Sequence, residues 1–239
     1  MSGLNIFTSN KLEVLAEKLA ELIKTPGRSA LDAETIVIQS PGMERWICLE
    51  LARHNGICAN VRFPFPNTFL EEIAQQALPD FQEPVSFDPD RMTFMIMKVI
   101  PECIQRPGFE RLKAYLAEDY THLKRFQLSS KLADIYDQYQ VFRPEMILQW
   151  EKGKQDADSE HPENKWQAQL WRKLVQGEKI RHRARLQRDL ITQLKTETAQ
   201  FKKLPERIFI FGISYLPFFH LEAFFALSQH LELNLFLLN

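Results

Sequence analysis

The turn within residues 36–46, Ile-Val-Ile-Gln-Ser-Pro-Gly-Met-Glu-Arg-Trp, is the place where this sequence could hold a phosphate. An apolar, β-branched run stops at Ser40 and passes directly into a helical pattern, and a helix N-terminus attracts anions. A nucleotide-binding P-loop needs G-x-x-x-x-G-K-[ST]. This turn has one glycine, no Lys-Ser/Thr pair and a proline without an N–H donor, and Glu44 would repel a triphosphate. The residues therefore favour an ordinary or degenerate strand-to-helix turn, which could still bind a lone anion.

The other reactive side chains indicate neither a hydrolytic triad nor a metal site. The six histidines are scattered, and no nucleophile-elbow sequence occurs. Three cysteines, Cys48, Cys58 and Cys103, form no metal-ligand spacing, and an odd, scattered set suits a reducing cytoplasm. The acidic stretch 156–163 contains His161, and we interpret it as a solvated loop. We expect no catalytic residue, no metal and no cofactor.

A basic run and one helical stretch carry side chains suited to nucleic acid. Residues 179–188 hold five basic residues and a histidine, a cluster of the kind that contacts phosphate. In the stretch 126–144, Asp134 and Asp137 are three residues apart and share a helix face. The same face also has these polar neighbours: Lys131, Gln138 and Arg143. Carboxylates, amides and arginine can read base edges, but solvated and salt-bridged helices are the commoner explanation of such residues, and the residues alone leave both interpretations open.

Length and composition describe an ordinary soluble globular protein. The chain has 239 residues, of which 45% are hydrophobic and 26% charged, enough for one large domain or two small ones. A formal net charge of −1 predicts no strong attraction of the whole molecule to nucleic acid or to membranes. No signal peptide and no run of transmembrane length is recognisable. We expect a cytoplasmic protein without membrane contact, whose polyanion site, if any, is a local patch.

Strand patterns lie at both ends of the chain and helical patterns between them. Strands are predicted over 4–8, 35–39, 60–63, 207–212 and 231–238. Helices are predicted over 11–24, 41–55, 67–78, 90–103, 109–118, 122–141, 163–176, 183–200 and 216–229. Ser40 is expected to cap the second helix, with Pro41 at its first position and Asn55-Gly56 at its end.

This order predicts an α/β fold in which a parallel sheet is interrupted by a large helical insertion. The expected core comprises 1–66 and 204–239, and the expected insertion comprises 67–203. The chain stops at Asn239, directly after a strand that looks central. We expect it to be a piece of a longer protein.

Six strings are more specific than these periodicities. They are IFTSNKLEVL, VIQSPGMERW, GI-x-ANVRFPFP, FQLSSKLADIYDQYQVFRP, WQAQLW and IFGISYLP, which lie in this order between residues 4 and 239. The chain thereby resembles the RecC family, the gamma subunits of exodeoxyribonuclease V, the bacterial RecBCD helicase–nuclease. The resemblance covers essentially the whole chain.

The resemblance implies a superfamily 1 helicase core that has lost its ATPase residues, with Ser40–Trp46 in place of the phosphate loop and facing DNA. It implies a non-enzymatic subunit that holds RecB-like and RecD-like partners together, helps to split forked DNA, and scans the 3′-ended single strand for the recombination hotspot Chi. The nuclease of such a complex belongs to the RecB partner. The alternative is a module that serves mainly protein–protein assembly and binds little DNA by itself.

Carried over position by position, the resemblance gives a set of DNA-contacting candidates: Gln39, Arg45, Phe65, Asp134, Asp137, Gln138, Arg143 and Arg183. Arginine would bind phosphate or guanine, glutamine and aspartate would discriminate bases, and Phe65 would offer a stacking or apolar wall. The sequence departs from the family pattern at Pro41, Arg45 and Glu71, where a hydroxyl residue, an amide and an aromatic residue are expected. Either the recognised sequence differs from the enteric Chi, or recognition is absent.

Overall fold

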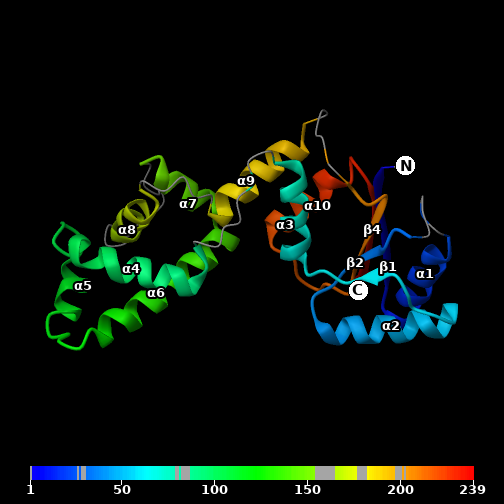
Figure 1. Ribbon diagram of the computed structural model, residues 1–239, viewed down its shortest axis with the longest axis horizontal. Helices are drawn as coiled ribbons and strands as arrows, with labels where there is room; N and C mark the ends of the chain where they lie inside the picture. Colours follow the sequence, from blue (N-terminus) through cyan, green and yellow to red (C-terminus); the bar gives the residue numbers. More distant parts are fainter. Residues whose placement is uncertain are drawn as a thin grey trace. The chain divides into compact units, whose positions relative to one another are not determined.

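A computed structural model describes residues 2–25, 27, 31–78, 81, 87–153, 165–176, 182–196, 201 and 203–239. Its contacts divide the chain into two compact units (Figure 1). Unit 1 comprises Met1–Phe81 and Leu190–Asn239, and unit 2 comprises Gln82–Asp189. The domain boundaries expected at 66/67 and 203/204 stay a prediction, since contacts alone do not define independent folding.

Unit 1 is built on a parallel sheet. Its strands are β1 (Gly3–Ser9), β2 (Glu34–Val37), β3 (Val61–Arg62), β4 (Arg207–Phe211) and β5 (Glu232–Leu238). Among the described residues they form one five-stranded sheet in the order β1-β5-β4-β2-β3, and every neighbouring pair is parallel. The predicted strands and the α/β class are confirmed, and β5 lies between β1 and β4, as its apolar sequence indicated.

Helices cover both faces of this sheet, which is why β2 and β4 are apolar at successive positions. Helices α1 (Leu12–Lys24) and α2 (Pro41–Asn55) pack on the face that carries Phe209 and Phe211. Figure 1 shows α3 (Pro66–Ala77) and α10 (Phe218–Leu227) together on the other side of the sheet. The rings of Phe69 and Phe224 hold these two helices together, with their centroids 6.2 Å apart.

The ends of α2 form as the sequence predicts. Ser40 is extended, and its Oγ accepts a hydrogen bond from the Met43 N–H at 3.2 Å, while Pro41 occupies the first turn. Gly56 ends the helix at φ +79°, in the left-handed region that glycine adopts without strain.

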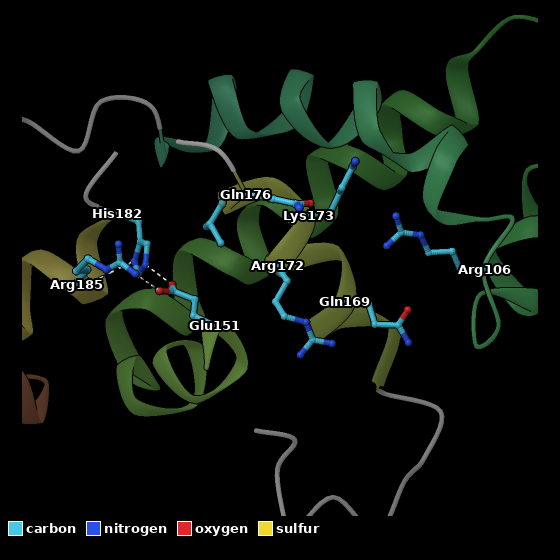
Figure 2. A pocket seen from close by; sticks show the side chains of 9 residues that line it. Arg106, Glu151, Gln169, Arg172, Lys173, Gln176, His182 and Arg185 are labelled. Carbon is cyan, nitrogen blue, oxygen red and sulfur yellow. Dashed lines mark hydrogen bonds and ion pairs between the residues drawn. The ribbon is translucent and has the colours of Figure 1, made fainter. Parts of the chain in front are cut away.

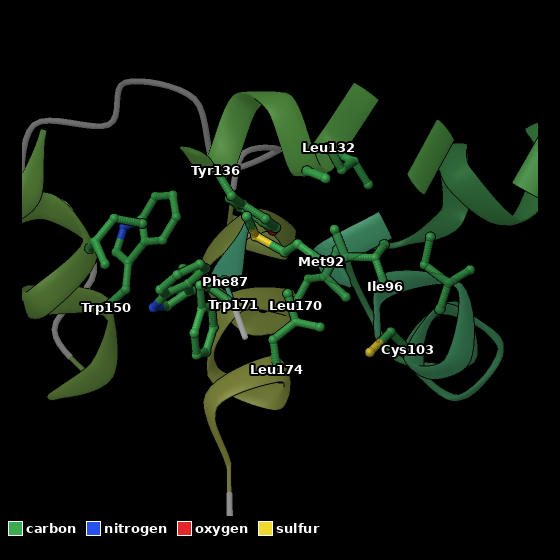
Figure 3. Close-up of a cluster of buried hydrophobic side chains, with 14 of the residues drawn as sticks. Phe87, Met92, Ile96, Cys103, Leu132, Tyr136, Trp150, Leu170, Trp171 and Leu174 are labelled. Carbon is green, nitrogen blue, oxygen red and sulfur yellow. The ribbon is translucent and has the colours of Figure 1, made fainter. Parts of the chain in front are cut away.

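Unit 2 is helical. It contains α4 (Pro89–Cys103), α5 (Glu110–Tyr115), α6 (Leu123–Phe142), α7 (Pro144–Glu151), α8 (Lys165–Val175) and the beginning of α9 (Arg183–Leu194), and the division between the units falls within α9. Its core gathers side chains from α4, α6, α7 and α8 around Trp171, which is completely buried (Figure 3). Tyr136 packs edge-on against Trp171 at a centroid distance of 5.3 Å, and its hydroxyl donates to the Gln167 carbonyl at 2.8 Å.

The predicted helices leave the interval between 141 and 163 empty, but unit 2 has a helix there. Pro144 does not lie between helices but begins α7, where the missing N–H of proline costs nothing. The fully buried residues of α6 are Ser129, Leu132, Ala133, Tyr136 and Gln140, and Leu128 and Tyr139 pack against the same core while partly exposed. Helix α6 packs closely against α4, and the small side chains of Ser129 and Ala133 are completely buried.

Within the described ranges, no helix is both long and apolar enough to cross a membrane. The same part of the chain has no cluster of three or more His, Cys, Asp or Glu residues that could hold a metal ion. The acidic stretch 156–163 lies outside the described residues, as do residues 177–181, which include the first three residues of the basic run.

Candidate nucleic-acid interface

The carboxyl ends of β2 and β4 lie at the switch point of the sheet, where an open parallel sheet commonly binds its ligand. From β2 the chain continues to β3, toward one edge of the sheet, and from β4 it continues to β5, toward the other edge. The strand order therefore reverses between β2 and β4. Here the Met43 side chain lies against Gly212: a Cβ on residue 212 would be only 2.7 Å from Met43 Cε. Gly212 has φ +64°, so glycine serves both the turn and the close approach. A protein side chain therefore occupies space at this switch point.

The start of α2 has few N–H groups to offer an anion. The Ser40 carbonyl accepts from the N–H groups of Met43 and Glu44 at 3.1 and 3.3 Å, and Pro41 has no N–H. In the part of the chain that the structure describes, this leaves the Gly42 N–H as the one backbone donor of the first turn without a partner. One donor is too few to surround a polyphosphate as a P-loop does.

Gln39 and Phe65 are brought together at this edge of the sheet. The Ile38 N–H donates to the Pro64 carbonyl at 3.1 Å, which continues the β2–β3 register and places Phe65 opposite Ile38, the residue before Gln39. Gln39 is exposed, and Phe65 is 42% exposed at the start of α3. Arg45 is exposed on α2, and its side chain makes no hydrogen bond or ion pair with any described residue. These three candidates belong to unit 1.

Asp137 and Arg183 form the best-defined contact among the candidates of unit 2. Arg183 Nη1 lies 3.0 Å from Asp137 Oδ1, and about 30% of each side chain remains exposed. The Arg183 backbone N–H, at the start of α9, donates to Oε1 of the completely buried Gln140 at 3.0 Å. Gln140 thus caps α9 and holds Arg183 beside α6, where the remaining guanidinium N–H groups can still meet a phosphate.

Asp134, Gln138 and Arg143 lie along the exposed part of α6. Asp134 and Gln138 are exposed and four residues apart, hence on the same side of the helix as Asp137. Arg143 ends α6, and its guanidinium lies over the Tyr139 ring at 5.8 Å. The face combines two carboxylates, an amide and two arginines, which are groups able to bind phosphates and base edges.

A buried charged network next to this face was missed by the sequence analysis. Glu151, at the end of α7, accepts from His182 Nε2, from Trp171 Nε1 at 3.2 Å and from Arg185 Nη2 at 2.6 Å. Burial alone would raise the pKa of the Glu151 carboxyl, but the hydrogen bonds and charges of His182, Trp171 and Arg185 together lower it. The only sequence signal was His182 within the basic run, since no motif joins residues 31 to 34 positions apart.

Comparison with known protein families decides the relationship. The model described as "RecC, N-terminal domain" matches residues 4–239. The chain belongs to the RecC family. Similar proteins named RecBCD enzyme subunit RecC occur in Escherichia coli (37% identical, 99% of this chain, 22% of that protein) and in Haemophilus influenzae (36% identical, 98% of this chain, 23% of that protein).

A more distant relative of the same name, from Mycolicibacterium smegmatis, is 27% identical over 98% of this chain and 21% of its own length. The chain thus spans about a fifth of the length of the curated relatives it matches. The resemblance deduced from six strings is confirmed at the level of the family. The roles of the eight candidate residues stay predictions.

Proposed function

We propose that this chain acts as the DNA-contacting and scaffolding N-terminal part of a RecC subunit in a RecBCD-type helicase–nuclease. In this role it contacts the 3′-ended single strand of forked DNA, contributes to Chi recognition during double-strand break repair, and associates with RecB-like and RecD-like subunits in the bacterial cytoplasm. The relatives' name, RecBCD enzyme subunit RecC, supports membership in such a complex.

The observation that carries the proposal is the contact of Met43 with Gly212 at the switch point of the sheet. A helicase core that hydrolysed ATP would need an open phosphate loop there, with several N–H donors and a lysine. Pro41 and the Met43–Gly212 contact favour instead a helicase-like sheet that has lost nucleotide binding and serves DNA. The chain would then be a non-catalytic part of the enzyme, without a cofactor of its own.

The candidate residues divide by chemistry into phosphate binders and base readers. Arg45, Arg143 and Arg183 would bind phosphates, which positions the strand without reading its sequence. Asp134 and Gln138, both exposed, would meet base edges, with aspartate accepting from a cytosine amino group and glutamine pairing with adenine. Asp137 would orient Arg183 through its 3.0 Å ion pair.

A second function, partner assembly with little DNA binding, is favoured by one exposed apolar face. On α10, Phe218, Leu221 and Phe225 recur at helical spacing and are 79%, 48% and 62% exposed. Replacing Phe218 and Phe225 by serine should weaken assembly with RecB-like and RecD-like subunits in size-exclusion chromatography and leave DNA binding unchanged. The opposite pattern would contradict this second function.

Fluorescence anisotropy with a labelled, 3′-tailed fork across a salt series tests the first function. We expect Arg45→Gln, Arg143→Gln and Arg183→Gln each to reduce the slope of log Kobs against log salt by roughly 0.7. Matched controls are Arg53→Gln, at the opposite end of α2 from Arg45, and Arg91→Gln in unit 2; both are exposed and pair only with carboxylates nearby. Asp134→Ala should change the preference between two oligonucleotide sequences by about 1–3 kcal/mol.

Two outcomes would contradict the proposal. If the wild-type chain fails to bind the fork at 20–50 mM salt while remaining folded, the DNA role fails and assembly becomes the preferred function. If Mg-ATP raises the melting temperature and is hydrolysed, and Met43→Lys changes neither result, the switch point of the sheet is not the retired nucleotide site proposed here.

A further inference from the structure

Unit 2 contains a polar cavity of about 580 Å³ that includes none of the predicted DNA contacts. Arg172 and Lys173 project from α8, between Arg106 on one side and the Glu151–His182–Arg185 group on the other (Figure 2). A volume of this size lies in the range of ligand sites. The question is which ligand these side chains would select.

The charge of the lining is strongly positive, although the chain as a whole carries −1. Among the described residues of the lining, Arg106, Arg172, Lys173 and Arg185 are cations and Glu151 is the one carboxylate. Both oxygens of Glu151 are already taken, Oε1 by His182 and Trp171 and Oε2 by Arg185. The remaining positive charge is not neutralised inside the cavity, so the lining favours an anion.

Several donors in the cavity are available. The Arg106 side chain forms no hydrogen bond or ion pair within the described ranges, and the same holds for Gln169 and Gln176. Arg172 uses Nη1 for the Trp150 carbonyl at 3.2 Å and keeps its other N–H groups. Lys173 pairs at 3.1 Å with Glu102, which is 65% exposed and lies at the rim, an arrangement that water and salt weaken.

The composition of the lining points to phosphate rather than to a protein segment. Val175 is the one apolar side chain among the described residues of the lining, and these residues form none of the buried aliphatic or aromatic anchor sites that dominate protein–protein interfaces. Arginines outnumber lysine three to one, and the planar guanidinium matches phosphate oxygens in pairs. Polar, positively charged and hydrated surfaces are typical of nucleic-acid contacts.

From this geometry we infer that the cavity lined by Arg106, Arg172, Lys173 and Arg185 binds backbone phosphates of a nucleic-acid strand, independently of base sequence. The inference rests on the proposed DNA-contacting function and adds a second phosphate contact to it. Arg106 and Lys173 hold the incoming phosphate, because Arg106 has no side-chain hydrogen bond or ion pair among the described residues and Lys173 has only its pair with the exposed Glu102. Glu151 and His182 hold Arg185 in position.

The test compares two double variants of the full chain that remove the same charge. Arg106→Gln/Lys173→Gln changes the cavity, and Arg91→Gln/Lys98→Gln changes exposed cations on α4 outside it. We measure binding of labelled dT20 and of a mixed-sequence 20-mer by anisotropy across a salt series. The cavity variant should lose about 1.4 from the salt slope, which is about 25-fold in affinity at 0.1 M salt, equally for both oligonucleotides. The control should keep the wild-type slope.

Each other outcome identifies what fails. If wild type binds DNA and the two double variants bind alike, the cavity inference is overturned and the DNA function stands. If wild type binds no DNA, calorimetry with tripolyphosphate decides. Binding that requires Arg106 and Lys173 would identify the ligand as a free phosphate compound and overturn the inference of a nucleic-acid strand. No binding would overturn the phosphate site altogether. Competition by polyglutamate as strong as that of an oligonucleotide of equal charge assigns the cavity to an acidic protein segment and overturns the inference. Unchanged melting temperatures of both variants confirm that they fold.

Discussion

Replacing Glu151 by alanine tests whether the buried network of unit 2 holds α7, α8 and the start of α9 together. The carboxylate accepts hydrogen bonds from Trp171, His182 and Arg185, which come from two other helical segments. His182 is 1% exposed and Trp171 is completely buried, so neither can exchange its lost bond for one with water. Arg185 is 46% exposed and can.

The size of the effect follows from this difference in exposure. Each buried donor left without a partner costs about 1–3 kcal/mol, and loss of the half-exposed arginine pair adds at most about 1 kcal/mol. We therefore expect Glu151→Ala to lower the free energy of unfolding by about 3–5 kcal/mol, comparable with the removal of one member of a buried ion pair. For an m-value of about 2 kcal/mol/M this moves the urea midpoint by roughly 2 M.

Tryptophan fluorescence is a suitable assay, because Trp150, Trp166 and Trp171 all belong to the core of unit 2. The matched control is Glu145→Ala on the same helix: Glu145 pairs with Arg188 but is 70% exposed, so its loss should cost no more than about 1 kcal/mol. A shift for Glu151→Ala no larger than that of the control would refute the reasoning. It would mean that the network fixes orientation without contributing to stability.

Three further predictions concern pH, the switch-point glycine and the α2 cap. The pKa of Glu151 in the folded protein lies below its ordinary value of 4.5, so its stabilisation is fully present above pH 4.5 and is lost as the pH falls through the folded pKa. Urea titrations between pH 3 and 6 should therefore show that the free energy of unfolding falls more steeply with acid for wild type than for Glu151→Ala. Gly212→Ala places a Cβ at φ +64° and displaces the end of Met43, and should lower stability by about 1–2 kcal/mol in thermal unfolding, whereas Gly42→Ala, whose Cβ meets nothing closer than 3.8 Å, should not. Ser40→Ala removes the hydrogen bond to the Met43 N–H and should cost about 0.5–2 kcal/mol by circular dichroism, with Ser40→Asp retaining stability.

The elements of this fold were largely predictable because their signals are local. The apolar runs of β4 and β5 and the Ser-Pro start of α2 each define their element within a few residues. Helix α7 was missed because Pro144 fits a helix start as well as a break, and only the structure distinguishes the two. The complete burial of Ser129 and Gln140 on α6 was not predictable, because their polarity alone marks both as surface residues.

The candidate site was predictable as a set of residues but not as a set of contacts. Asp137 and Arg183 were each named from the sequence, yet they lie 46 positions apart, and no local pattern indicates their ion pair. The capping role of Gln140 is also invisible in the sequence, where it is one amide among several on α6. Such long-range pairings depend on how α6 and the start of α9 pack within unit 2.

Net charge is the sequence property that says least about polyanion binding in this chain. A value of −1 argued against attraction of the whole molecule, and it still does at distances beyond about 10 Å, where salt screens the field. Within the cavity of unit 2, four cations face one carboxylate that is already satisfied, and screening over a few ångströms is weak. Long-range attraction should therefore accelerate association little. The affinity should nevertheless depend steeply on salt, because each phosphate contact releases counterions whatever the net charge of the protein. An association rate nearly independent of salt, together with a dissociation rate that rises steeply with salt, is the kinetic pattern that this distribution of charge requires.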